Sequence, residues 1–112
     1  FTASKMAGQM YKLVFFVPAE HCEQVKAAVF EAGAGAQGNY ACCSWQVLGQ
    51  GQFLPLDGSQ PFIGEMGKVE QVDEYRVETL CPEERVRDVI AALKLAHPYE
   101  EPAFEFYQLV TM

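Results

Sequence analysis

Lysine and arginine are scarce in this sequence. The chain has 8 basic residues against 15 acidic ones, and its formal net charge at pH 7 is -7. No local cluster of basic side chains offsets this balance, and a phosphate backbone would be repelled. We therefore expect no nucleic-acid partner and no binding to anionic membrane surfaces.

Long apolar runs are also missing. No stretch approaches the roughly 18 to 20 residues needed to cross a bilayer, and the first residues lack the charged, apolar and small-residue parts of a secretory signal. These absences predict a cytoplasmic protein. At 112 residues, with 50% hydrophobic residues, the chain is expected to form one domain with its own packed core.

Catalytic and metal-binding motifs are sparse. The four cysteines form no Cys-x-x-Cys pair, so they are interpreted as buried, reduced thiols and not as a zinc framework: Cys22, Cys42, Cys43 and Cys81. The glycines match neither GxGxxG nor GxxxxGK[ST], which leaves a phosphate-binding loop unsupported. The first nine residues carry no apolar periodicity. We interpret residues 1–9 as an expression remnant and residues 10–112 as the domain.

The opening of the domain reads as strand, helix, strand. Residues 11–17, YKLVFFV, are apolar on both faces, as in a central strand covered on both sides. Apolar side chains then recur at helical spacing from Glu20 to Ala32, before two glycines. Residues 39–48 alternate as a second strand, with Cys43 and Trp45 on one face and Tyr40 and Cys42 on the other.

The second half repeats this order. Residues 68–80 predict a strand, Pro82 begins a helix with a buried stripe that ends at His97, and residues 104–110 predict a last strand. The order β-α-β-β-α-β indicates an α+β, ferredoxin-like fold, in which an antiparallel sheet carries two helices on one face. The uncovered face is then expected to pack against copies of the same chain.

Charged residues alternate along the third predicted strand. Glu74, Arg76 and Glu78 share one face of this strand and could form a pair of catalytic carboxylates around an arginine. An arginine flanked by glutamates two residues away more often forms weak ion pairs on a solvated face. We interpret the three side chains in this second way.

A long loop separates the second and third predicted strands. Residues 49–67 contain five glycines, two prolines and apolar residues such as Phe53 and Phe62. Loops of this length are uncommon in compact domains and often carry function. Two interpretations stay open: a structural excursion that packs on a neighbouring subunit, or a ligand-responsive loop.

The segment AHPYEEPAFEFY, residues 96–107, is the richest in chemical groups. His97 with Glu100 and Glu101 offers a mixed nitrogen and oxygen set that suits zinc or copper, but a closed site usually needs four ligands. His97 could act as a general base, yet no nucleophile can be assigned. The two prolines could instead fix a tight turn between helix and strand, with Tyr99 as an anchoring aromatic.

Several strings together resemble a known family. They are HPYEEPAFEFY at 97–107, GNYACCSW at 38–45, GQGQFLP at 49–55 and PFIGEMGKVEQVDEYRVE at 61–78. In this order they are similar to the small domain of the YqfO-like family, the NGG-interacting-factor-three-like proteins. The HPYE-x-P string also resembles the CutA family of divalent-cation-tolerance proteins, which has a PII-like ferredoxin fold. On this resemblance the chain is expected to be a stand-alone copy of the small domain.

The resemblance implies a homotrimer with sheets packed around a central axis. In the larger YqfO-like proteins the dinuclear metal site belongs to flanking halves, so no hydrolase activity is carried over. The chain departs from CutA in its longer second loop and in Glu101, where that family usually has an aliphatic residue.

These arguments give a leading prediction and two alternatives. The leading one is a non-catalytic regulatory or binding module that holds a divalent metal ion at inter-subunit clefts through His97, Glu100, Glu101, Cys42 and Cys43. Aromatic side chains are candidates for contacting a small ligand: Tyr40, Trp45 and Tyr99. The second is a metabolite or nucleotide sensor that uses the 49–67 loop, and the third, ranked last, is a hydrolase with His97 as acid or base.

Overall fold

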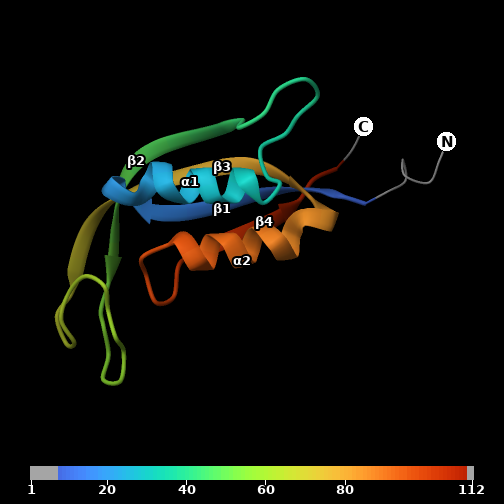
Figure 1. Ribbon diagram of the computed structural model, residues 1–112. Coiled ribbons are helices and arrows are strands. Elements are labelled where there is room, and N and C mark those ends of the chain that lie inside the picture. Colours follow the sequence, from blue (N-terminus) through green and yellow to red (C-terminus); the bar gives the residue numbers. More distant parts are fainter. Residues whose placement is uncertain (1–7, 111–112) are drawn as a thin grey trace.

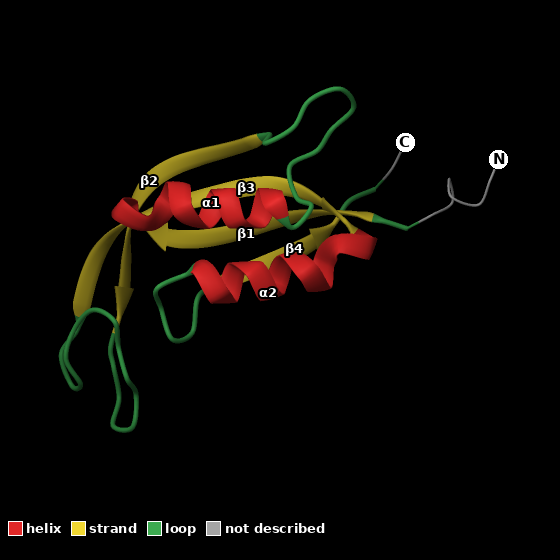
Figure 2. Ribbon diagram, viewed as in Figure 1, coloured by secondary structure: helices red, strands yellow, loops and turns green. Residues whose placement is uncertain are grey.

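The computed structural model describes residues 8–110. The chain forms a single four-stranded antiparallel sheet in the order β2-β3-β1-β4. Two helices, α1 and α2, lie side by side on one face of the sheet (Figures 1 and 2). The elements are β1 (Met10–Pro18), α1 (Cys22–Glu31), β2 (Ser44–Phe53), β3 (Glu70–Pro82), α2 (Val86–Ala96) and β4 (Phe104–Gln108). The predicted ferredoxin-like α+β fold is confirmed.

β1 is one of the two inner strands of the sheet and pairs with β3 on one side and β4 on the other. Phe15 lies opposite Val77 of β3 and opposite Phe104 of β4. Leu13, Phe15 and Val17 face the helices and are fully buried. Their burial explains the apolar residues at alternate positions of YKLVFFV, because successive side chains of a strand point to opposite faces. Val14, on the face away from the helices, is also fully buried.

The helices cover the sheet through small and branched side chains. In α1 the buried residues are Cys22, Val25 and Val29, and in α2 they are Val89 and Leu93. These buried side chains recur every three or four residues, so they form one face of each helix, and that face packs in the core. α1 ends before Gly33, whose φ of 124° closes the turn in a conformation that glycine adopts without strain.

The cysteines divide into two groups. Cys22 and Cys81 are buried free thiols, as predicted, and burial raises the pKa of Cys81 to about 11. Cys43 is half-buried and Cys42 is exposed, so the prediction of a buried thiol is wrong for Cys42.

The second strand starts and ends later than predicted. Residues 39–43 are not part of it, and Cys42 has a φ of 57°, which interrupts an extended run. The strand begins at Ser44 and continues to Phe53, paired residue by residue with β3. The connection to β3, hereafter the β2–β3 loop, therefore covers residues 54–69, and the first five residues of the predicted loop are strand.

The other element boundaries shift by a few residues. β3 runs to Pro82 and β4 ends at Gln108. Of the predicted remnant, residues 1–7 lie outside the described residues. The N–H of Glu83 donates to the carbonyl of Gln9 at 2.8 Å, and the N–H of Gln9 donates to the side-chain Oε1 of Glu83 at 2.9 Å. Among residues 8–110, no helix is long and apolar enough to span a membrane.

The face of the sheet opposite the helices, hereafter the open face, carries no covering element within residues 8–110 (Figure 1). Trp45 and Val47 of β2 lie on it and are 59% and 44% exposed, and Tyr107 of β4 is half exposed. Arg76 and Glu78 of β3 form an ion pair of 3.1 Å on the same face. For these two residues the predicted solvated face with ion pairs is confirmed.

Candidate functional site

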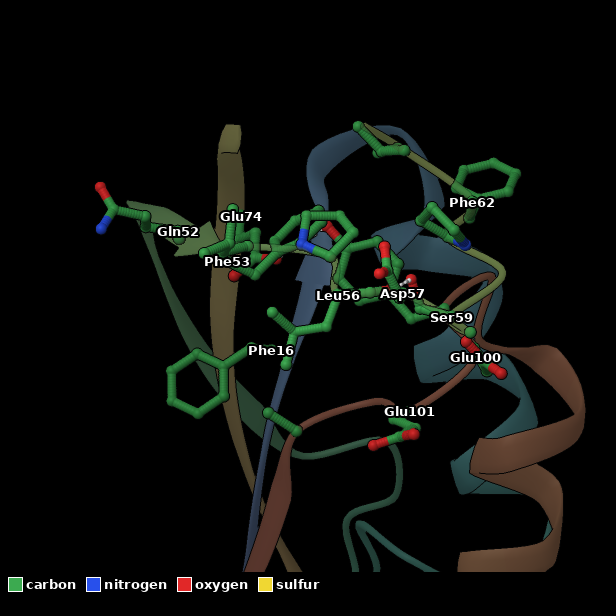
Figure 3. Close-up of a pocket in the computed structure, with 18 residues that line it drawn as sticks. Phe16, Gln52, Phe53, Leu56, Asp57, Ser59, Phe62, Glu74, Glu100 and Glu101 are labelled. Atoms are coloured by element: carbon green, nitrogen blue, oxygen red, sulfur yellow. Dashed lines mark hydrogen bonds between the residues drawn. The ribbon is translucent and has the colours of Figure 1, made fainter. Parts of the chain in front are cut away.

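A cavity lies at the end of the sheet where β1 reaches the helices. It has a volume of about 690 Å³ and is bounded by the β2–β3 loop, the sheet and the segment that links α2 to β4. In Figure 3, Phe53 and Glu74 lie on the sheet side, Asp57 and Ser59 on the loop side, and Glu100 and Glu101 on the linking segment. The lining residues are Phe16, Gly51–Ile63 except Gln60, Glu74, Tyr99, Glu100, Glu101 and Ala103.

His97 fixes the segment between α2 and β4, residues 97–103, to β1. Its Nε2 lies 2.7 Å from the carbonyl oxygen of Phe16, and its Nδ1 lies 3.1 Å from the backbone nitrogen of Tyr99. A backbone N–H can only donate, so Nδ1 accepts and Nε2 carries the proton that it donates to Phe16. Both ring nitrogens are thus engaged within the chain.

The surroundings of His97 favour its neutral form. The side chain is buried, and this burial lowers the pKa of the imidazole. The hydrogen bond to Phe16 opposes this shift, whereas the nearby His21 lowers the pKa further. Protonation of Nδ1 would place an N–H against the donor of Tyr99. This arrangement supports the interpretation of HPYEEP as a tight turn anchored by a histidine and an aromatic residue.

Tyr99 connects the turn to the sheet. Its hydroxyl donates a 2.9 Å hydrogen bond to Oε2 of Glu74, and its ring lies 5.8 Å from that of Phe53. Burial, with the adjacent Glu74 carboxylate, raises the pKa of Tyr99 well above its usual range. The phenol therefore stays protonated and serves as a hydrogen-bond donor that orients Glu74.

Gly51 gives the Glu74 side chain room to lie across β2. A Cβ atom at this position would overlap the Glu74 carboxylate, whereas a Cβ at Gly49 would meet nothing within 4 Å. Glu74 is half-buried and faces the cavity. The interpretation of Glu74 as part of a solvated ion-pair face is therefore wrong, because Gly51 and Tyr99 draw its carboxylate toward the cavity.

Two contacts hold the β2–β3 loop over the cavity, and a third closes its base. The backbone N–H of Gln60 donates to Oε1 of Glu100 at 3.0 Å. The ring of Phe62 packs edge-on against His21, with centroids 5.4 Å apart. At the base of the loop, the N–H of Gly67 donates to the carbonyl of Pro55 at 2.7 Å. The loop is thus tied both to the 97–103 segment and to the start of α1.

The predicted site residues separate into groups. Tyr99, Glu100 and Glu101 line the cavity, and His97 lies behind them as the buried anchor. Trp45 is on the open face. The remaining three lie in the segment between α1 and β2, where the N–H of Cys43 donates to Gly35 and residues 37 and 40 pair: Tyr40, Cys42 and Cys43.

The predicted metal ligands do not converge within one chain. Among residues 8–110, no three histidine, cysteine, aspartate or glutamate side chains lie close enough together to hold a metal ion. His97 would have to give up one of its two hydrogen bonds to bind a metal. The metal assignment stays a prediction that requires ligands from a second copy.

Sequence reasoning proposed the 49–67 loop but missed two cavity residues of the sheet, Phe16 and Glu74. Phe16 and Glu74 belong to strands that the sequence placed correctly, but only the assembled sheet shows that both meet the loop. The glycine-rich composition of the loop was the signal that pointed to this region.

Comparison with known proteins places these features in context. No protein-family model matches the chain. A curated protein of Mycobacterium tuberculosis named GTP cyclohydrolase 1 type 2 homolog is 54% identical over 104 residues, which are 93% of this chain and 27% of that protein. A solved Bacillus cereus protein related to NIF3 is 42% identical, with a TM-score of 0.80 over 93% of this chain and 26% of that one. The chain resembles one segment of the NIF3-related proteins.

The chain spans about a quarter of the length of these NIF3-related relatives. Smaller proteins share the fold over most of their own length. CutA of Archaeoglobus fulgidus is 16% identical, with a TM-score of 0.66 over 92% of this chain and 86% of that one. A Bacillus subtilis GlnK, solved as a complex with ATP, is 14% identical, with a TM-score of 0.61 over 93% and 84%. The predicted YqfO-like and CutA/PII-like resemblances are confirmed.

Proposed function

We propose that this domain is a non-catalytic binding module whose ligand site is the cavity between the β2–β3 loop and the 97–103 segment. The cavity itself carries the proposal. Its volume of about 690 Å³ lies in the range of small-molecule sites, roughly 300 to 1,000 Å³. It combines apolar walls with a few polar groups, and each wall is held by contacts between segments far apart in the sequence.

A binding role fits the chemistry better than a catalytic one. His97, the histidine predicted as acid or base, uses Nδ1 and Nε2 in hydrogen bonds to the backbone, and its neutral form is favoured. A general base needs a free nitrogen within reach of the substrate. Tyr99 keeps its proton, because burial and Glu74 raise its pKa.

Self-association belongs to the same proposal. The open face exposes Trp45, Val47 and Tyr107, and large exposed apolar side chains gathered on one face favour contact with another protein surface. The resemblance to CutA and PII proteins supports a homotrimer in which this face is covered by copies of the chain. The cavity then lies at the end of the sheet, beside the 97–103 segment.

The relatives' name refers to GTP cyclohydrolase, and this activity is not proposed for the cavity. Among the described lining residues there are four carboxylates and no lysine, arginine or histidine. A triphosphate would be repelled, because phosphate sites rely on basic side chains or helix N-termini. The same argument weighs against ATP as the ligand here.

A thermal-shift screen of small fragments, with a variant whose cavity is filled, tests the proposal. Ala103 lines the cavity and is exposed, so Ala103→Trp would occupy the site without burying the new ring in the core. The exposed Ala91 of α2 provides the matched control, Ala91→Trp. A ligand at ten times its Kd raises the free energy of unfolding by about 1.4 kcal/mol, which is several degrees in Tm for a domain of this size.

We expect fragments that raise the Tm of the native chain and of Ala91→Trp but not of Ala103→Trp. Fragments that stabilise all three proteins equally would place binding outside the cavity and contradict the proposal. A screen in which no fragment stabilises the native chain would contradict it as well.

A further inference from the structure

We propose that the cavity takes an organic cation, namely an ammonium group attached to an apolar body. This inference rests on the proposed function, because it names the ligand class of the same site. It follows from three properties of the lining: the sign of its charges, their spacing and the aromatic rings between them.

The charges of the described lining have one sign. Asp57, Glu74, Glu100 and Glu101 contribute carboxylates, and none of the described lining residues is basic. Glu74 uses Oε2 to accept from Tyr99, and Glu100 uses Oε1 to accept from Gln60. A carboxylate has two oxygens, so each keeps an acceptor for a ligand. An anionic ligand would face four like charges, whereas a cation would reduce their mutual repulsion.

The spacing of the carboxylates favours a large cation over a metal ion. Within the described part of the chain, no three acidic, histidine or cysteine side chains converge as metal ligands do. The four carboxylates are instead distributed over the sheet, the loop and the 97–103 segment (Figure 3). A metal ion needs several oxygens at 2.0 to about 2.6 Å from one point. An ammonium group on an organic body can meet one or two of them at hydrogen-bond or van der Waals distance.

Aromatic rings supply the second part of the recognition. Phe53 and Tyr99 lie 5.8 Å apart in the wall beside Glu74. Ring faces attract cations within about 6 Å of their centroids, most strongly where water is excluded. The ring of Phe16 already has a cationic neighbour, because the Arg76 guanidinium lies over it at 5.7 Å from the centroid. Arg76 lies outside the lining and pairs with Glu78, so we assign the ligand to Phe53 and Tyr99 and not to Phe16.

Three probes of similar size and different charge test the inference. They are benzyltrimethylammonium, benzyl alcohol and phenylacetate, each titrated into the ¹⁵N-labelled full chain and followed by amide chemical shifts. The cation is expected to saturate shifts of the cavity residues and to bind about tenfold more tightly than benzyl alcohol. Phenylacetate is expected not to saturate. Added salt should weaken the binding of benzyltrimethylammonium and leave the affinity of benzyl alcohol unchanged.

Variants with one carboxylate removed show which groups hold the cation. Glu74→Gln and Glu101→Gln are each expected to raise the Kd of benzyltrimethylammonium by about fivefold or more. Glu101 is exposed, so its substitution leaves the packing of the chain intact. Glu84 is an exposed carboxylate in the turn just before α2, and Glu84→Gln is the control that should leave the Kd of benzyltrimethylammonium unchanged.

The outcomes separate this inference from the proposed function. Equal or tighter binding of benzyl alcohol or phenylacetate in the cavity would overturn the cation assignment and leave the binding module standing. Equal weakening by Glu84→Gln and Glu101→Gln would overturn it too, because the effect would then be one of net charge. Failure of all three probes to perturb cavity residues would contradict the cation and count against the cavity as a site.

Discussion

Replacing His97 with alanine removes the anchor of the 97–103 segment, and the structure sets the size of the effect. Two hydrogen bonds are lost: the one to the Phe16 carbonyl at 2.7 Å and the one from the Tyr99 N–H at 3.1 Å. A buried group left without a partner costs about 1 to 3 kcal/mol. His97 is only 5% exposed, so the variant also leaves unfilled space.

We expect His97→Ala to lose about 2 to 4 kcal/mol of unfolding free energy, a large share of the roughly 5 to 15 kcal/mol that a domain has. Urea unfolding at pH 7.5, followed by circular dichroism, measures it. Lys94→Ala in the last turn of α2 is the control and should stay within about 0.5 kcal/mol of the native chain, because Lys94 is exposed. A loss below about 1 kcal/mol for His97→Ala would refute the anchor.

The pH dependence follows from the same group. Burial lowers the pKa of His97 in the folded chain below its value in the unfolded chain, so the unfolded chain binds more protons as the pH falls. The stability that the neutral His97 contributes is complete above the pKa of histidine in the unfolded chain, about 6.5. As the pH falls below this value, the free energy of unfolding decreases by at most about 1.4 kcal/mol per pH unit. Urea unfolding of the native chain and His97→Gln between pH 7.5 and 5.5 isolates this contribution. Parallel curves would contradict it.

Two further predictions concern single positions with matched controls. Gly51→Ala displaces the Glu74 carboxylate and should abolish fragment binding in the cavity. It should cost less than about 1 kcal/mol of unfolding free energy, because the Glu74 side chain can rotate away. The control is Gly49→Ala, whose added methyl group meets open space and should leave fragment binding unchanged. If both variants bind alike, Glu74 is not held as described. Trp45→Glu on the open face should convert a trimer to monomers in sedimentation velocity, while Leu95→Glu, 90% exposed on α2, should remain a trimer. A monomeric native chain, or a trimeric Trp45→Glu, would contradict the open-face interface.

The fold followed from the sequence because its signals were local. The apolar run YKLVFFV indicated an inner strand, and the spacing of apolar residues in α1 and α2 indicated two amphipathic helices. The strand after α1 was misplaced because CCSW suits an extended run, whereas Cys42 adopts a positive φ set by the surrounding turn. Its pairing with β3 then carried the strand into a glycine-rich stretch that resembled a loop.

The site followed only in part, because its residues meet through tertiary contacts. HPYEEP was identified as a turn or a ligand site, and its Tyr99, Glu100 and Glu101 do line the cavity. Glu74 was assigned to solvent because alternation along a strand reports a face and not what lies above it. The contact between Tyr99 and Glu74, 25 residues apart, carries no local signal.

The most direct test of the binding module is a map of where a bound fragment contacts the chain. Amide chemical shifts of the ¹⁵N-labelled protein, recorded with the fragment that raises the Tm most, give this map. We predict that the largest changes fall on Phe16, Phe53, residues 54–63 and residues 99–103, the walls of the cavity. Changes confined to the segment around Cys42, or spread evenly over the open face, would contradict the assignment of the cavity as the ligand site.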